Sequence, residues 1–136
     1  MPFILQLVKS VQIIEPDNTE TDVSYSHPDI PFSIFFSVCE DNSARAELRT
    51  AESILHETMH LMLTLIENRI DLVVPNTKET FYSPWREEQR PVRGVLHGLF
   101  VFRAIFEFYR IVENISANSN ELEFIQFRIE QITEEI

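Results

Sequence analysis

Residues 44–68, ARAELRTAESILHETMHLMLTLIEN, contain the strongest helical pattern in the chain and decide its fold. Apolar side chains recur there at three- and four-residue spacing, which predicts one core-facing stripe. The stripe consists of Leu48, Ala51, Leu55, Met59, Met62 and Ile66. The preceding residues 40–43, EDNS, supply the acidic and capping side chains that typically begin a helix. We therefore expect a helix from Ala44 to about Asn68.

Upstream of this helix the pattern favours strands. Residues 3–14, FILQLVKSVQII, mix branched and aromatic side chains and end in a cluster of turn formers. Residues 23–26 could form a short second strand. Residues 30–39, IPFSIFFSVC, are dense in Phe, Ile and Val, which predicts a strand buried on at least one face.

Downstream, residues 71–89 contain Pro75 and Pro84 and little periodicity, so we expect an ordered loop. Pro91 fits the first turn of a second helix that continues to about Asn114. That helix is apolar nearly all round, so it should be central. After a polar break, residues 121–136 predict a third, acidic, amphipathic helix.

These elements predict a single α+β domain over residues 1–136. Residues 1–40 would be mainly strands and residues 41–136 mainly helices. We expect a small antiparallel N-terminal sheet packed on the long helix, with a central apolar helix and a C-terminal helix. This arrangement differs from the jelly roll of many oxygenases.

Length and composition exclude several classes of protein. At 136 residues and 44% apolar side chains, the chain suits one globular domain. One Cys cannot form an internal disulfide, no run of about 18 apolar residues occurs, and the start lacks a basic signal-peptide region. A cytoplasmic protein without a membrane partner is expected. The net charge of −11 argues against nucleic acid as a partner.

Within the long helix, His56-Glu57-Thr58-Met59-His60 forms an H-E-x-x-H motif. Four residues advance a helix by about 6 Å and return to the same face, so both imidazoles can bind one metal ion. Glu57 lies beside them, within reach of a metal-bound water. The motif alone does not choose between hydrolysis and oxidation.

A third ligand would narrow the choice. Leu63 and Ile66 stand where one metalloprotease class carries Gly and His, which excludes that class. His97 is the best candidate because it lies on the central helix between Gly94 and Gly98, the only two glycines. Two glycines one turn apart suggest that a neighbouring helix approaches closely there and brings His97 to the histidine pair.

Other candidate ligands are weaker. Glu67 and Glu79 could serve as the downstream carboxylate of a protease, although neither lies on an evident helix facing the first. His27 precedes a proline in an expected loop and is not expected to be a ligand.

The basic side chains are concentrated beside this expected site. Residues 86–110 hold five Arg and three Glu, a local charge of +2 that leaves −13 for the rest of the chain. Arg86, Arg90 and Arg93 precede His97. Arg presents a rigid fork suited to a carboxylate, so an iron site that binds a dicarboxylate co-substrate would explain them better than a hydrolytic zinc site.

Two other interpretations remain open. A zinc-dependent metallopeptidase would use the same histidines, with Glu57 as general base. A metal-free binding module would use the aromatic stripe of the central helix, comprising Phe100, Phe102, Phe106, Phe108 and Tyr109.

Three motifs together carry a resemblance to a known family: residues 56–60 (HETMH), 81–86 (FYSPWR) and 90–98 (RPVRGVLHG). In this combination the chain resembles the 2-oxoglutarate-dependent, HExxH-type peptide β-hydroxylases, the HExxH motif-containing peptide-modification proteins of ribosomal peptide natural-product clusters. The match spans about residues 30–110.

The resemblance implies an oxidoreductase, a dioxygenase that uses Fe(II), 2-oxoglutarate and O₂ to hydroxylate the β-carbon of a residue in a ribosomally made precursor peptide. By position, it implies His56, His60 and His97 as iron ligands. Arg90 and Arg86 become candidates for the co-substrate carboxylate, together with Arg93 from the charge pattern. Independently of the resemblance, the aromatic side chains of Tyr82 and Trp85 are candidate walls of a peptide pocket, with simple loop packing as the alternative. The precursor would be presented with a separate leader-peptide-binding protein or by a homodimer.

Overall fold

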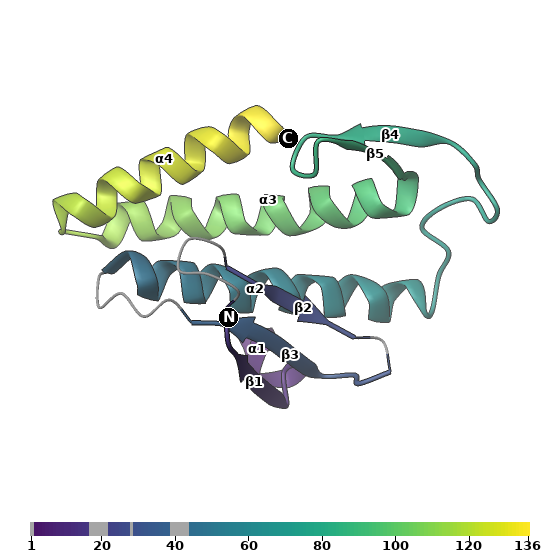
Figure 1. Ribbon diagram of the computed structural model, residues 1–136, viewed down its shortest axis with the longest axis horizontal. Helices are drawn as coiled ribbons and strands as arrows, with labels where there is room; N and C mark the ends of the chain where they lie inside the picture. The colour runs from purple at the N-terminus through teal and green to yellow at the C-terminus, as the bar shows by residue number, and fades with distance from the viewer. Residues whose placement is uncertain (1, 17–21, 28, 39–43) are drawn as a thin grey trace.

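The computed structural model describes residues 2–16, 22–27, 29–38 and 44–136. It confirms the α+β class, with helices that carry most of the chain and two small sheets (Figure 1). The helices are α1 (Pro2–Leu7), α2 (Ala44–Glu67), α3 (Val92–Ile115) and α4 (Ser119–Glu135). The strands are β1 (Ser10–Ile14), β2 (Ser24–Ser26), β3 (Ser33–Ser37), β4 (Thr80–Ser83) and β5 (Glu88–Pro91).

Helix α2 lies between two layers, with α3 on one side and the β1–β3–β2 sheet on the other (Figure 1). The larger core joins Leu55 and Met59 of α2 to α3 and α4. The smaller core joins Leu61 to Ile34 and Phe36 of β3. The expected stripe of α2 is therefore only one of its two buried faces, because the sheet covers a second face that sequence periodicity does not separate from the first.

Helix α3 is central, as its composition predicts. It packs on α2, α4 and the β4–β5 hairpin. Val101, Ile105 and Tyr109 are fully buried along its length. Tyr109 and the half-buried phenylalanines beside it contribute to this core, which leaves little of the aromatic stripe for a binding surface.

The N-terminal sheet is mixed, and the expectation of an antiparallel sheet was wrong. Strand β1 pairs with β3 in parallel, whereas β2 pairs with β3 antiparallel. Strand β2 lies between β1 and β3 in the sequence and runs opposite to β3, so β1 and β3 have the same direction. The expected strands at residues 23–26 and 30–39 correspond to β2 and β3, although Cys39 lies outside the described residues.

The expected strand over residues 3–14 is only half correct. Its first part is helix α1, and only residues 10–14 form β1. Phe3 and Ile4 pack against the larger core from this short helix. An apolar run this short suits a helix as well as a strand, and Pro2 fits a first helical turn.

Residues 71–89 are not wholly a loop, because β4 and most of β5 form an antiparallel hairpin there. Its turn spans residues 84–87, and Glu87 adopts a left-handed φ of 52°. Most hairpin side chains are exposed, so no apolar alternation reveals the strands in the sequence.

The ends of the helices agree closely with expectation. Helix α2 begins at Ala44, but the expected start signal at residues 40–43 lies outside the described residues. Pro91 immediately precedes α3. Asn118 caps α4 by accepting hydrogen bonds from the backbone N–H groups of Asn120 and Glu121. No helix in the described part of the chain is long and apolar enough to cross a membrane.

Candidate functional site

Helices α2 and α3 bring together the three histidines expected from the sequence. Nε2 of His60 lies 3.2 Å from Nε2 of His56, and Nδ1 of His60 lies 3.1 Å from Nδ1 of His97. The other ring nitrogen of His97, Nε2, lies 3.0 Å from Oε2 of Glu67. The result is a chain of three imidazoles that ends on Glu67.

Burial favours the neutral forms of His56 and His60. It lowers the pKa of His56, although the carboxylate of Glu52 partly opposes the shift. Burial also lowers the pKa of His60 to about 3, with further contributions from the two neighbouring imidazoles and from Arg86 and Arg90. A neutral imidazole has a lone pair available for a metal.

The donor chemistry therefore fits a transition metal, and so does one of the spacings. A separation of 3.2 Å between the Nε2 atoms of His56 and His60 is about that of adjacent ligand atoms around an ion with metal–nitrogen bonds near 2.1 Å.

His97 approaches His60 through the opposite ring nitrogen, so the three imidazoles do not converge on one point. Across the described ranges, no group of three or more His, Cys, Asp or Glu side chains is arranged to hold a metal ion. Joint coordination by all three imidazoles would require their rings to rearrange.

Glu57 follows His56 directly and is turned by about 100° around α2, toward strand β2. Its side chain is 3% exposed and accepts a hydrogen bond from Oγ of Ser24, on β2, at 2.7 Å. Burial raises the pKa of Glu57, and hydrogen bonds from Ser24 and Ser26 partly oppose the shift. The carboxylate of the motif therefore fastens α2 to the sheet.

The three expected arginines divide into two groups. Arg93 is held by Glu67, with its Nε and terminal nitrogens 2.6–3.1 Å from the carboxylate. Arg86 has no ion pair with any described residue, and Arg90 has only Glu88, at 3.7 Å. Both Arg86 and Arg90 lie close enough to the histidines to lower the pKa of His60.

Glu67 links Arg93 to the histidine chain. Burial alone would raise the pKa of Glu67, but hydrogen bonds from Arg93 and His97 outweigh it, so the pKa is lowered. An ionised Glu67 therefore stands behind His97 and accepts from it. Sequence reasoning considered Glu67 only as a protease ligand, because its position at the end of α2 gives no sign that His97 lies opposite.

The two glycines have a different role from the one expected. A Cβ on Gly98 would lie 2.0 Å from Cζ2 of Trp85, and one on Gly94 would lie 3.3 Å from Nε of Arg90. Both glycines therefore make room for residues of the hairpin region, not for the approach of α2. The expectation of a helix contact was wrong because sequence spacing does not say which neighbour meets a glycine.

The two expected pocket residues, Trp85 and Tyr82, lie in different surroundings. The Trp85 ring lies 5.5 Å from that of Phe102, which in turn lies 5.7 Å from the ring of His56, so Trp85 belongs to the site. Tyr82 is 57% exposed on the hairpin. His27 is outside the site, as expected, with a side chain that is 54% exposed.

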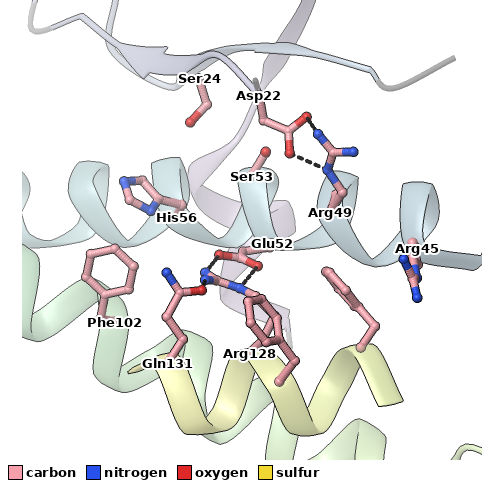
Figure 2. A pocket seen from close by; sticks show the side chains of 12 residues that line it. Asp22, Ser24, Arg45, Arg49, Glu52, Ser53, His56, Phe102, Arg128 and Gln131 are labelled. Atoms are coloured by element: carbon pink, nitrogen blue, oxygen red, sulfur yellow. Dashed lines mark hydrogen bonds and ion pairs between the residues drawn. The ribbon is translucent and has the colours of Figure 1, made fainter. Parts of the chain in front are cut away.

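A groove of about 610 Å³ leads away from His56 along α2 (Figure 2). Glu52 lines the groove and anchors a network with α3 and α4. It accepts a 2.6 Å hydrogen bond from the Tyr109 hydroxyl and two from the Arg128 guanidinium. Burial, together with Glu52, raises the pKa of Tyr109.

Three functional neighbours have no clear signal in the sequence: Glu67 behind His97, Ser24 on Glu57, and Phe102 against His56. Phe102 could have been found only as one of many apolar residues of its helix. Neither a protein-family model nor a curated protein sequence matches the chain.

Proposed function

We propose that this chain is an Fe(II)/2-oxoglutarate-dependent dioxygenase that hydroxylates the β-carbon of a residue in a ribosomally made precursor peptide. The proposal places the enzyme in the cytoplasm, with the precursor presented with a separate leader-binding protein or by a homodimer. The three sequence motifs that carry the family resemblance meet in one place. Residues 56–60, the hairpin turn at Trp85 and the start of α3 all contact the histidine chain or its immediate neighbours.

One observation carries the proposal furthest. Two guanidiniums, those of Arg86 and Arg90, lie beside a cluster of neutral imidazoles, and neither forms a close ion pair with a described carboxylate. A cationic site with two available guanidiniums suits a dianionic co-substrate. Hydrolysis by zinc has no need for these side chains.

His56, His60 and His97 would hold the iron, and Glu67 stands beside His97 as the acceptor that orients its ring. Bound iron would supply the oxygen-activating chemistry, in which O₂ and 2-oxoglutarate are consumed. Arg90 and Arg86 would hold the far carboxylate of 2-oxoglutarate. We leave Arg93 out of this role, because Glu67 already occupies its guanidinium. Trp85 and Phe102 would wall the site and exclude water.

The zinc peptidase is less well supported. Its mechanism needs Glu57 to face a metal-bound water. In the structure Glu57 faces Ser24 on the sheet side of α2, away from His97. The oxygenase, unlike the peptidase, leaves this carboxylate free for a structural task.

The test begins with anaerobically purified protein supplied with Fe(II), 2-oxoglutarate and O₂, together with the precursor peptide encoded beside its gene. We expect succinate to form together with a product that is 16 Da heavier than the precursor. Arg90→Ala should raise the KM for 2-oxoglutarate, and His97→Ala should remove activity. His27→Ala is the matched control and should behave as wild type. A metal-loaded protein that turns over neither 2-oxoglutarate nor the matching precursor would refute the proposal.

A further inference from the structure

We propose that the groove along α2 binds an extended acidic segment of the peptide substrate, and that Arg45 pairs with a carboxylate about five residues away from the modified position. The identification of this peptide as a substrate rests on the proposed function. The binding itself depends only on the groove.

The groove has a defined floor, two walls and two ends. Glu52, Ser53 and His56 of α2 form its floor, and Asp22 and Ser24 line it from the side of β2. Side chains of α4 line the opposite side. His56 and Arg45 lie at opposite ends, so a chain in the groove would run from the histidine site toward the beginning of α2 (Figure 2).

The charge of the groove opposes that of the whole protein. Its lining contains the guanidiniums of Arg45, Arg49 and Arg128 against the carboxylates of Asp22 and Glu52. Arg49 pairs with Asp22 at 2.6 and 2.8 Å, and Arg128 pairs with Glu52. Arg45 forms no ion pair with a described residue. Among the described lining side chains, the guanidinium of Arg45 is therefore the one without a carboxylate partner.

An acidic ligand is compatible with the net charge of −11. Charges on distant parts of the surface are screened over about 8 Å at physiological ionic strength. Among the described side chains that line the groove, positive charges exceed negative ones by one.

The length of the groove sets the spacing. Arg45 precedes His56 by eleven positions, which at a helical rise of about 1.5 Å corresponds to about 16 Å. An extended peptide advances about 3.3 Å per residue, so about five residues span that length.

Two features favour an extended backbone in the groove. Among the described strands, β2 is an edge strand that pairs with β3 alone, and extended peptides can add to such an edge. Phe124 and Phe127 of α4 also line the groove, and Phe127 is 59% exposed. They offer apolar contacts to alternate side chains of such a strand, whereas a compact small ligand would leave most of the groove unfilled.

The test measures binding separately from catalysis. The probes are two fluorescein-labelled dodecapeptides with a central Phe, identical except that one carries Glu where the other carries Lys. Fluorescence anisotropy at low ionic strength reports their Kd on wild type, Arg45→Glu and Arg69→Glu. Arg69 is exposed just beyond the other end of α2 and does not line the groove, so its reversal is the charge-matched control.

We expect the acidic peptide to bind more tightly than the basic one. Arg45→Glu should weaken the acidic peptide by about fivefold or more, and Arg69→Glu by less than about twofold. In a second series, a single Glu moved along a neutral peptide should bind best four to six residues from the Phe. Thermal melts check that both variants fold.

Three results would overturn the inference: no preference for the acidic peptide, equal losses in the two variants, or no optimum in the position of the Glu. Because binding is measured without iron or 2-oxoglutarate, failure of hydroxylation would leave this result unchanged. Conversely, hydroxylation of a precursor whose rate Arg45→Glu does not alter would refute the groove and leave the proposed function standing.

Discussion

The two faces of α2 carry the two halves of the H-E-x-x-H motif. On the face toward α3, His56 and His60 contact each other and reach His97. On the face toward the sheet, Glu57 accepts a hydrogen bond from Ser24 and is almost completely buried. The motif is continuous in sequence, but its chemistry is divided by the helix.

This division explains how one helix serves two purposes. The helix side has the buried imidazoles of His56 and His60 with the guanidiniums of Arg86 and Arg90 beside them, and these groups suit ligands. On the sheet side, the buried carboxylate of Glu57 accepts hydrogen bonds from the hydroxyls of Ser24 and Ser26 on β2. We infer that the helix side binds and the sheet side holds the fold.

The largest expected effect concerns the network on the helix side. Glu52→Ala would leave the Tyr109 hydroxyl and the Arg128 guanidinium without their shared acceptor. Removing one partner of such a buried pair costs about 3 kcal/mol or more of unfolding free energy. Urea unfolding measures the loss. Glu52→Gln, which keeps an acceptor, should lose less, and equal stabilities for both variants and wild type would contradict the network.

The second prediction separates metal binding from folding on the same side. His60→Ala removes the central imidazole and should weaken Fe(II) or Zn(II) binding by about 100-fold or more, beyond the usual cost of losing an outer-shell partner. Metal content after dialysis measures this. His27→Ala is the control because His27 lies outside the site. An unchanged metal affinity in His60→Ala would show that the histidine chain is not the metal site.

The third prediction addresses the sheet side. Ser24→Ala removes one of the hydrogen bonds to buried Glu57 and should cost about 1 kcal/mol of stability. Metal affinity should not change, because Ser24 donates its hydrogen bond to Glu57 and not to one of the three histidines. If Ser24→Ala lowered metal affinity as strongly as His60→Ala, the division between the faces would be wrong.

The fourth prediction concerns the pH dependence of stability. The folded-state pKa of His60 is lowered from 6.5 to about 3, so between these values only the unfolded chain binds that proton. Acidification through this window therefore destabilises the fold. Glu57 has the opposite sign, because its raised pKa lets the folded chain bind a proton first as the pH falls toward 4.5.

Unfolding of the metal-free protein at several pH values tests this contrast. His60→Asn should flatten the loss of stability between pH 6.5 and 4, and Glu57→Gln should steepen it, because each variant removes one of the opposing contributions. Identical slopes in the two variants would contradict the assignment of these groups.

Much of the fold could be predicted because local patterns determine it. The 3.6-residue period located α2, α3 and α4 to within a few residues. The sequence could not show that β1 lies parallel to β3, because that depends on where β2 returns along the sheet. The exposed hairpin at Thr80–Ser83 and Glu88–Pro91 has no apolar alternation to reveal it.

In the site, too, local patterns could be predicted and contacts between distant segments could not. Residues related by helical spacing, such as His56 and His60, were predictable as neighbours, and His97 was found through its flanking glycines. The contacts of those glycines were not predictable, since Trp85 reaches Gly98 from a turn distant in sequence. Neither was the direction of Glu57, because one-residue steps around a helix turn a side chain from one layer to the other.

The most direct test of the account is the product formed by Glu57→Gln. The variant keeps the shape of the side chain and a partner for Ser24, and it removes only the capacity to act as a base. Mass spectrometry of the precursor peptide after incubation with Fe(II), 2-oxoglutarate and O₂ should show a 16 Da gain with both wild type and Glu57→Gln. Cleavage of the peptide by wild type that is lost in Glu57→Gln would contradict the account and establish the zinc peptidase instead.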